Sequence, residues 1–292
     1  MKDASDSSMA CDGQDAEPAI EICNLSYHYE KVRQTYLITE LDQRYADCLT
    51  DISLKIAKGS RVLVVGGNGA GKSTLLSILG GRKMVPERSA LVLGRPAFHD
   101  STLSNDVMYL GEWWKNEFFM DVPMRDCVRE HLDDPRFQVL RRCLDVDLDW
   151  RISRVSDGQR RRCQLLAHLA TRRKVYIMDE VTTDLDVVGR DSLMRMLRLE
   201  SERRGVTILY ATHIFDNMEG WPTHILYLRK GQIHTFCKME DFTQYHRLRA
   251  EGCLMPLYTV VREWLYEELH EGNSGRDLTL TDDELLGGST SG

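Results

Sequence analysis

The feature that most constrains this 292-residue chain is the segment Gly66–Thr74, which reads Gly-Gly-Asn-Gly-Ala-Gly-Lys-Ser-Thr. It fits the phosphate-loop pattern, in which two glycines, a lysine and a hydroxyl residue stand at fixed spacing. The apolar run 62–65 before it is typical of a strand buried on both faces, and 75–79 after it has helical length and ends at two glycines. Strand, loop and helix therefore follow one another in the order that phosphate binding requires.

Backbone amides, one cation and one hydroxyl supply the chemistry of this loop. The glycines let consecutive N–H groups face one concavity, and the helix N-terminus adds its positive end. Lys72 would bring a point charge to the terminal phosphates, and Ser73 stands where a Mg²⁺ ligand is needed. We therefore expect the nucleotide to be bound by Gly66, Gly67, Asn68, Gly69, Ala70, Gly71, Lys72, Ser73 and Thr74.

The charge of the chain is concentrated at its two ends. The formal net charge is −7, and residues 1–18 and 271–292 each carry −4, which leaves +1 for the body. We expect both ends to be disordered acidic tails. A body this close to neutrality argues against a nucleic-acid-binding surface.

Targeting signals and cysteine usage indicate a cytoplasmic protein, with the nucleus as an alternative. The chain start lacks a secretory or Arg-rich transit signal, and no apolar stretch reaches the roughly 18 to 20 residues of a membrane-spanning helix. The eight cysteines form no C-x-x-C pair. This favours reduced thiols over disulfides or a zinc site.

The hydrophobic pattern predicts an α/β chain. Alternation at 51–56 followed by Lys58-Gly59 and the run 61–65 suggests a β-hairpin that leads into the glycine loop, and 30–50 resembles an insertion or a long loop. Further strands are expected at 20–29, 91–93, 107–110, 175–178 and 206–210, and a β-hairpin at 225–235. Helices are expected at 124–132, 137–144, 159–169 and 190–204, and a last one from 257.

Three further segments place polar residues at a helix N-terminus or shortly after a predicted strand, where functional side chains are often found. Ser156 and Gln159 have capping-box spacing, which marks a helix N-terminus. The strand at 175–178 ends at Asp179-Glu180, and the strand at 206–210 is followed by His213. Each has a structural alternative: an ordinary helix cap, an exposed strand end and a structural histidine.

Together with the glycine loop, these segments resemble the ATP-binding cassette (ABC) ATPase domain. The resemblance is closest to the small soluble single-cassette members of plants and fungi, of which the fungal one is described as an associate of the transcription and mRNA-deadenylation machinery. The segments that carry the closer match are 92–100, 109–113, 155–162 and 179–188.

The resemblance implies a P-loop NTPase core with a parallel sheet, an antiparallel β subdomain and a helical subdomain. It covers residues 19–270, so the chain would consist of one cassette between two tails. Within it, the helical subdomain spans about 113–169, the insertion about 30–50 and the C-terminal helix about 257–270.

The resemblance also implies roles for single residues around ATP and Mg²⁺. Tyr29 would stack on adenine, with Tyr27 as the alternative. Asp179 would hold Mg²⁺, and Glu180 would act as general base towards the attacking water. His213 would contact the γ-phosphate.

A second copy of the chain would complete the site. The resemblance implies that two ATP molecules are buried between head-to-tail protomers, because a glycine loop contacts phosphates from one side only. The partner copy would offer the signature turn Ser156, Asp157, Gly158 and Gln159, and Asp186 would lie in a loop that touches across the dimer.

Three positions depart from the general cassette. Glu112 stands where most members have a Gln; a carboxylate there can still meet Mg²⁺. Asp157 replaces a signature glycine and adds negative charge near the arriving phosphate, which would slow closure unless its side chain turns away. Val181 stands where proline is common.

Two patterns outside these motifs have alternative interpretations. Arg160, Arg161 and Arg162 point in different directions on a helix, so solvated, salt-bridged arginines are favoured over a nucleic-acid patch. The apolar stripe of the last helix favours core packing over a docking face for a partner. Its members are Leu257, Val260, Val261, Trp264, Leu265 and Leu269.

The sequence therefore predicts an ATPase that closes into a homodimer on Mg-ATP and passes this motion to a protein partner, with a role in gene-expression regulation as one prospect. One alternative is the ATPase subunit of a membrane transporter whose spanning subunits are separate chains. The other is a low-turnover module that ATP switches, which Asp157 favours.

Overall fold

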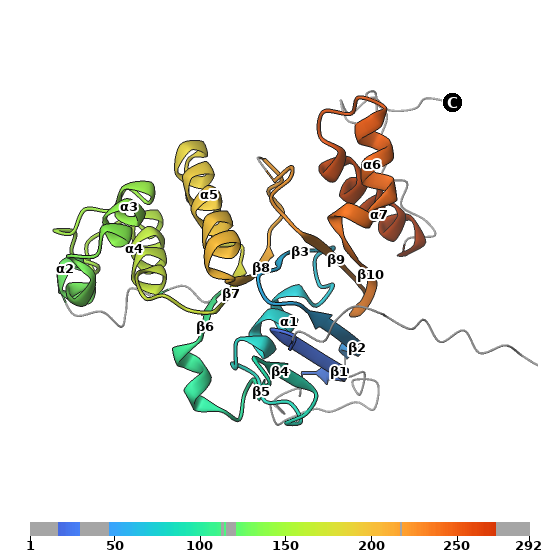
Figure 1. Cartoon of the computed structure of the whole chain (residues 1–292), viewed down its shortest axis with the longest axis horizontal. Helices are drawn as coiled ribbons and strands as arrows, with labels where there is room; N and C mark the ends of the chain where they lie inside the picture. Colours follow the sequence, from blue (N-terminus) through green and yellow to red (C-terminus); the bar gives the residue numbers. More distant parts are fainter. Residues whose placement is uncertain (1–16, 30–46, 112–113, 115–120, 217, 273–292) are drawn as a thin grey trace, which may run out of the picture.

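The structure is a computed structural model that describes residues 17–29, 47–111, 114, 121–216 and 218–272. Within these ranges the chain forms two β-sheets, with helices packed around them (Figure 1). None of the helices in the described ranges is both long enough and apolar enough to span a membrane.

The smaller sheet is antiparallel. Ile20 pairs with Ile56 and Ile22 with Leu54, so that apolar residues of both strands share one buried face. In spatial order its strands are β2 (Asp47–Ile56), β1 (Ile20–His28), β4 (Ala90–Val92) and β5 (Arg95–Pro96).

The larger sheet is parallel except at one edge, where β10 pairs antiparallel with β9 as the predicted hairpin. Its central strand β3 pairs with β8 on one side and β9 on the other. In spatial order the strands are β10 (Gln232–Lys238), β9 (His224–Arg229), β3 (Arg61–Val65), β8 (Thr207–Ala211), β7 (Val175–Asp179) and β6 (Val107–Leu110).

The two faces of β3 belong to two different hydrophobic cores. Val62 and Val64 face the core shared with the smaller sheet, and Leu63 and Val65 face the core that the remaining helices cover. Every residue of β3 is buried, as expected for a central parallel strand. The apolar run 62–65 therefore places the glycine loop at the end of a strand that is buried on both faces.

Helices α2 to α7 contribute to the core on one face of the larger sheet, and α1 contributes to the core on the other face. In Figure 1, α2, α3 and α4 make a lobe at one end of the molecule and α6 and α7 lie at the other, with α5 beside the lobe. Their bounds are α1 Lys72–Leu79, α2 Met124–Cys127, α3 Pro135–Cys143, α4 Asp157–Ala170, α5 Val187–Arg204, α6 Thr243–Ala250 and α7 Pro256–Gly272.

The predicted hairpin between 51–56 and 61–65 is wrong. β2 pairs with β1 in the smaller sheet, whereas β3 enters the larger one, so the turn at 57–60 joins two sheets. The burial pattern explains why: β2 alternates buried and exposed residues and suits a half-exposed antiparallel sheet, while β3 is buried on both faces.

The structure also differs from the sequence predictions at some element boundaries and in one helix. The strand expected to begin at 51 begins at Asp47, so only 30–46 of the proposed insertion lies outside the described residues. The helix expected at 124–132 ends at Cys127, and a 3₁₀ turn, Arg129–His131, follows it. Helix α6 was not predicted because Tyr245 is its one buried residue and gives no apolar periodicity.

A buried ion-pair network ties the helical lobe to the core. Glu200 of α5, whose side chain is 7% exposed, accepts from Arg136 of α3 and Arg204, each at 2.6 Å. Arg136 also donates to the Leu169 carbonyl at the end of α4, at 2.7 Å. One arginine thus holds three helices together.

We expect Glu200→Ala to lower the free energy of unfolding by about 3 kcal/mol, because it leaves two arginines without their buried partner. Urea denaturation followed by circular dichroism measures the change. Glu251→Ala is the control, since Glu251 is 61% exposed and lies 3.9 Å from Arg247. Equal losses in the two variants would contradict a special role for the buried network.

Candidate nucleotide-binding and catalytic site

The candidate site lies where three neighbouring parallel strands end. β3, β8 and β7 are adjacent and parallel, so their carboxyl ends meet at one edge of the sheet. Gly66 follows β3, Asp179 ends β7, and His213 lies two residues after β8. Ligands of open α/β sheets bind at this edge, so the topology brings the predicted motifs together.

The loop can adopt its shape only with glycine at two of its positions. A β-carbon on Gly66 would lie 2.4 Å from the carbonyl oxygen of Leu228, and one on Gly71 would lie 2.7 Å from that of Cys48. Gly71 also has φ +98° directly before α1. The loop is therefore pressed against β9 and β2, with its helix N-terminus in place for an anion.

Lys72 folds back onto the loop. Its Nζ donates to the carbonyl oxygens of Gly66 at 2.7 Å and Gly67 at 3.0 Å. Burial lowers the pKa of Lys72, while the carboxylates of Glu180, Asp179 and Glu268 act in the opposite direction. The ammonium group is therefore held beside the loop, within a group of three negative charges.

Ser73 and Asp179 fit a Mg²⁺ site that uses phosphate and water as its other ligands. The Asp179 carboxyl is hydrogen-bonded to Ser73, yet burial dominates and raises its pKa. Its Oδ1 is buried and lacks a hydrogen-bond partner among the described residues. Because Mg²⁺ needs few protein carboxylates and keeps several waters, this hydroxyl–carboxylate pair suits it.

Glu180 and His213 face each other across the ends of β7 and β8. His213 Nδ1 lies 2.8 Å from Glu180 Oε2, although within the described part of the chain this oxygen has no hydrogen bond of good angle. Glu180 has φ +52°, a left-handed conformation that is costly for a residue with a side chain. The fold therefore holds Glu180 in a strained but defined position.

A cavity of about 400 Å³ joins the loop to this pair. It brings together Gly66, Gly67, Asn68, Lys72, Glu180 and His213 of the predicted site. The remaining lining residues are Val65, Thr212, Phe215, Val261, Leu265, Glu268 and Leu269. The last four belong to α7, whose contribution to the site the sequence did not indicate.

Tyr29 lies on the other side of the loop, outside this cavity. Its hydroxyl is 2.9 Å from Thr74 Oγ1, and Lys83 Nζ lies 4.5 Å from the centre of its ring. The ring is 45% exposed and meets Tyr27 edge to face. Cys48, which was not predicted, also donates to Thr74, at 3.0 Å. Tyr29 is therefore the more accessible ring, at the end of the loop away from Glu180.

The signature turn is not part of the cavity in the single chain. Ser156 caps α4: its Oγ accepts from the Gln159 amide at 3.2 Å, and Gln159 Oε1 accepts from the Ser156 amide at 2.9 Å. The predicted capping box is thus confirmed. Ser156 and Asp157 are exposed. The face of this turn is therefore open to another molecule.

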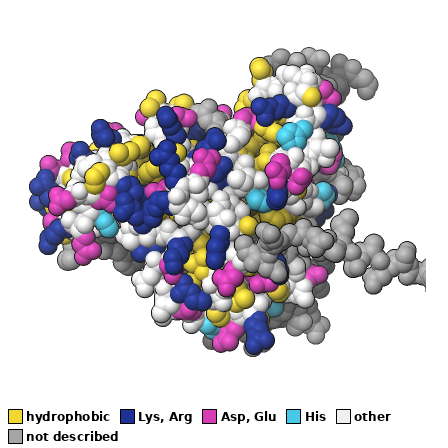
Figure 2. Space-filling view, in the orientation of Figure 1, with side chains coloured by type: hydrophobic (Ala, Val, Ile, Leu, Met, Phe, Trp, Pro, Cys, Tyr) yellow, Lys and Arg dark blue, Asp and Glu magenta, His cyan; other side chains and the backbone are white. Residues whose placement is uncertain are grey.

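The three arginines after this turn are salt-bridged, as predicted, but Arg160 is buried rather than solvated. Arg160 pairs with Asp157 at 2.7 Å, Arg161 with Asp184 at 2.6 Å and Arg162 with Asp145 at 3.0 Å. The pair between Arg160 and Asp157 bears directly on the signature turn, because the buried Arg160 guanidinium offsets the extra negative charge that Asp157 brings there. In Figure 2, acidic and basic side chains are interspersed over this face of the molecule.

Two remaining site residues have different outcomes. Asp186 caps α5 by accepting from the Gly189 amide at 2.7 Å, and it is exposed. Glu112 lies outside the described residues, so its predicted part in the metal site stays a prediction. The apolar stripe of α7 is mostly core, as favoured, since Leu257, Val260, Val261 and Trp264 are buried.

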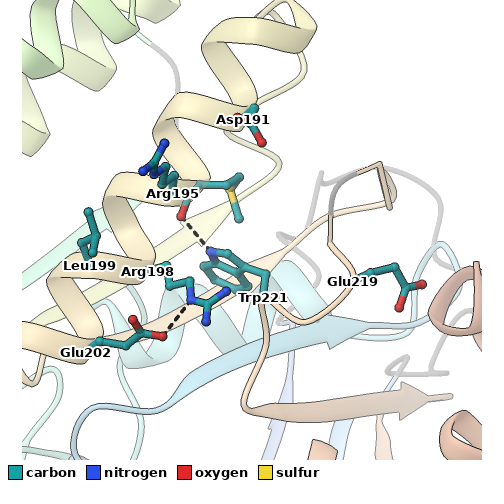
Figure 3. A pocket seen from close by; sticks show the side chains of 8 residues that line it. Asp191, Arg195, Arg198, Leu199, Glu202, Glu219 and Trp221 are labelled. Carbon is teal, nitrogen blue, oxygen red and sulfur yellow. Dashed lines mark hydrogen bonds and ion pairs between the residues drawn. The ribbon is translucent and has the colours of Figure 1, made fainter.

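A second cavity, of about 390 Å³, lies between α5 and the segment that precedes β9 (Figure 3). Two of its charged groups are paired with each other, Arg198 with Glu202 at 2.7 Å, and Trp221 donates its indole N–H to the Met194 carbonyl at 2.9 Å. It holds none of the predicted site residues. The candidate site is therefore the cavity at the strand ends.

The fold and the site define a nucleotide-binding protein of the P-loop α/β class. Comparison with known proteins is more specific. The family described as "ABC transporter" matches residues 49–183. A relative from Arabidopsis thaliana, ABC transporter I family member 20, is 42% identical over 241 residues, which cover 78% of this chain and 71% of the relative.

A yeast relative, CCR4-associated factor 16 of Saccharomyces cerevisiae, is 37% identical over 237 residues, or 74% of this chain and 77% of its own length. Among solved structures, a dimeric ATP-binding cassette in a post-hydrolysis state with ADP and phosphate has the same fold. Its TM-score is 0.60 at 19% identity, covering 76% of this chain and all of that one.

The chain therefore belongs to the ATP-binding cassette family, and the predicted family and fold class are confirmed. Cassettes of this family bind ATP with Mg²⁺, hydrolyse it and dimerise on ATP.

We expect Asp179→Asn to raise the unfolding temperature of the nucleotide-free protein by a few degrees, because the substitution removes a buried negative charge that lacks a full set of partners. The same variant should lose the further stabilisation that Mg²⁺ adds in the presence of nucleotide. Thermal denaturation with EDTA, with nucleotide and with both nucleotide and Mg²⁺ measures both effects. A less stable variant in EDTA would contradict this view of Asp179.

Proposed function

We propose that this protein is an ATPase that binds Mg-ATP between two head-to-tail protomers, hydrolyses it and passes the resulting closure to a partner protein. The observation that carries the proposal is the cavity at the strand ends, where Lys72, Glu180 and His213 face the phosphate loop. The orphaned Oδ1 of Asp179 supports a metal at the same place.

In the proposed reaction, the loop amides and Lys72 hold the triphosphate, while Ser73 and Asp179 hold Mg²⁺. Bound Mg²⁺ would neutralise charge on the phosphate oxygens as the terminal group is transferred. Glu180 accepts a proton from the attacking water, whose oxygen bonds to the γ-phosphorus as the bond from that phosphorus to the bridging oxygen breaks. His213, beside Glu180, contacts the γ-phosphate and keeps the carboxylate oriented.

The exposed signature turn supports a second protomer. Ser156 and Asp157 are open to solvent and lie outside the cavity of their own chain, so they suit the site of another copy. Val187 and Val188, directly after Asp186, are 65% and 75% exposed. Adjacent exposed valines next to a functional loop are typical of a surface that another molecule covers.

The partner proposed to receive the motion is a protein in the regulation of gene expression. The support is the yeast relative, which is named for its association with CCR4. The cytoplasm is the proposed location, and the seven described cysteines, which are all thiols, fit a reducing compartment.

We expect Glu180→Gln to lower the rate of ATP hydrolysis by roughly a hundredfold or more while ATP binding is retained, because the amide cannot accept the proton. Steady-state phosphate release and equilibrium binding measure the two quantities. Glu240→Gln is the control, since Glu240 is 72% exposed and pairs only with Lys238 in the described part of the chain. Hydrolysis at the parent rate would refute the assignment of Glu180.

A mixing experiment tests the head-to-tail arrangement. Lys72→Ala removes the phosphate contact of one composite site, and Ser156→Arg blocks the turn that the partner copy offers. Each variant alone should be inactive. A mixture forms dimers in which one site carries both defects and the other carries neither, so activity should return to about a quarter of the parent, given random pairing and independent sites. A mixture that stays inactive would contradict the composite site.

A transporter role is a second candidate. Energy-coupling factor transporter ATP-binding proteins, such as EcfA2 of Enterococcus faecalis, are 27% identical over 266 residues. Their names favour an ATPase subunit whose spanning subunits are other chains. Affinity purification of the Glu180→Gln variant from detergent-solubilised membranes distinguishes the candidates, because recovery of a multi-span protein would favour the transporter.

A further inference from the structure

Helix α7 places a carboxylate at the phosphate loop. Glu268 lines the same cavity as Lys72, Glu180 and His213. A β-carbon built on Gly67 would lie 3.3 Å from Glu268 Oε2, so the carboxylate lies directly against the loop backbone. No motif accounts for an acidic group here, and a negative charge is unfavourable where a triphosphate has to bind.

A single tyrosine holds Glu268 in this position. Tyr227 of β9 donates its hydroxyl to Glu268 Oε2 at 3.1 Å and to the Trp264 carbonyl at 3.2 Å. Its ring stacks on that of Trp264, with centres 4.7 Å apart. Burial raises the pKa of Tyr227, so the hydroxyl stays a donor. The contact is therefore specific, but the neutral tyrosine hydroxyl does not cancel the negative charge of the carboxylate.

No arginine or lysine neutralises this carboxylate by a direct ion pair within the described ranges. The cation that it influences is Lys72: burial lowers the pKa of this lysine, and Glu268 opposes that shift together with Glu180 and Asp179. In the nucleotide-free molecule, Glu268 therefore contributes to the set of negative charges around Lys72. A bound triphosphate would take over this role and would be repelled by the same carboxylate.

The position of Glu268 indicates which end of a bound nucleotide would lie near its carboxylate. Gly66, Gly67 and Asn68 share its cavity with Glu180 and His213, the residues proposed to act on the γ-phosphate. Tyr29 and Thr74 lie outside this cavity, at the end of the loop proposed to bind adenine. The carboxylate therefore faces the terminal phosphate, which ATP has and ADP lacks.

We propose that Glu268 is a specificity-determining residue that opposes the terminal phosphate, so that ATP, but not ADP, displaces the C-terminal end of α7 from the phosphate loop. The proposal rests on the ATP-binding function proposed above. It makes α7 a reporter of the triphosphate state: the helix is docked without nucleotide or with ADP, and its last turns are released with ATP. Leu265 and Leu269, which line the cavity beside Glu268, move with it.

The first test measures nucleotide affinity without turnover. Dissociation constants of the full-length protein for Mg²⁺ with β,γ-imido-ATP and for Mg²⁺ with ADP are obtained by calorimetry. We expect Glu268→Gln to bind the triphosphate analogue about tenfold more tightly, with ADP changed by less than about twofold. Glu267→Gln is the matched control, since Glu267 is exposed and does not line the cavity. It should leave both constants unchanged.

The second test uses the unmodified protein and so does not depend on how the variant folds. Hydrogen exchange at the amides of 265–272 should become faster with β,γ-imido-ATP and should stay unchanged with ADP. Tyr227→Phe, which removes the hydroxyl that holds Glu268, should give faster exchange there without nucleotide.

Several results would overturn the proposal. One is an affinity of Glu268→Gln for the analogue no higher than that of the parent, and another is an equal gain in affinity for ADP and the analogue. Slower or unchanged exchange of α7 with the analogue would refute the displacement. If the parent bound neither nucleotide, the proposed ATPase function would itself be wrong. If the parent bound both and Glu268→Gln had the same affinities as the parent, only the proposed role of Glu268 would be wrong.

Discussion

The parallel pairing of β3, β8 and β7 is the constraint on which the site depends. Because these strands are adjacent and run in one direction, their ends deliver Gly66, Asp179 and His213 to one edge of the sheet. The pairing is enforced by burial, since all five residues of each strand are inaccessible. A change that shifted one strand by a residue would move its site group away from the others.

The same pairing explains how much the sequence could predict. Runs such as 62–65 and 175–178 are apolar throughout, so they could be assigned as buried strands, and the motifs at their ends could be placed with them. The pairing of β2 could not, because alternation shows that a strand has one exposed face but not which sheet receives it. The hairpin prediction failed for this reason.

The contribution of α7 to the candidate site could not be predicted from the sequence for a related reason. Its apolar stripe was correctly taken as core, but Glu268 reaches the phosphate loop only because the helix crosses β9 with Trp264 stacked on Tyr227. Such a crossing depends on tertiary packing and leaves no mark on local sequence. The ion pair between Asp157 and Arg160 could have been predicted from the sequence, because the two residues are three positions apart on one helix.

The contacts at the two ends of α4 determine how a movement of this helix would displace the Ser156 turn. Arg136 fixes the carboxyl end of the helix to α5, while Arg161 links the other end to Asp184, in the segment after β7, through a partly exposed ion pair. A helix of 14 residues is about 21 Å long, so a tilt of about 10° at the fixed end displaces the Ser156 turn by roughly 4 Å. A rigid-body rotation of α4 about its Arg136 end would therefore become a displacement of several ångströms at the Ser156 turn.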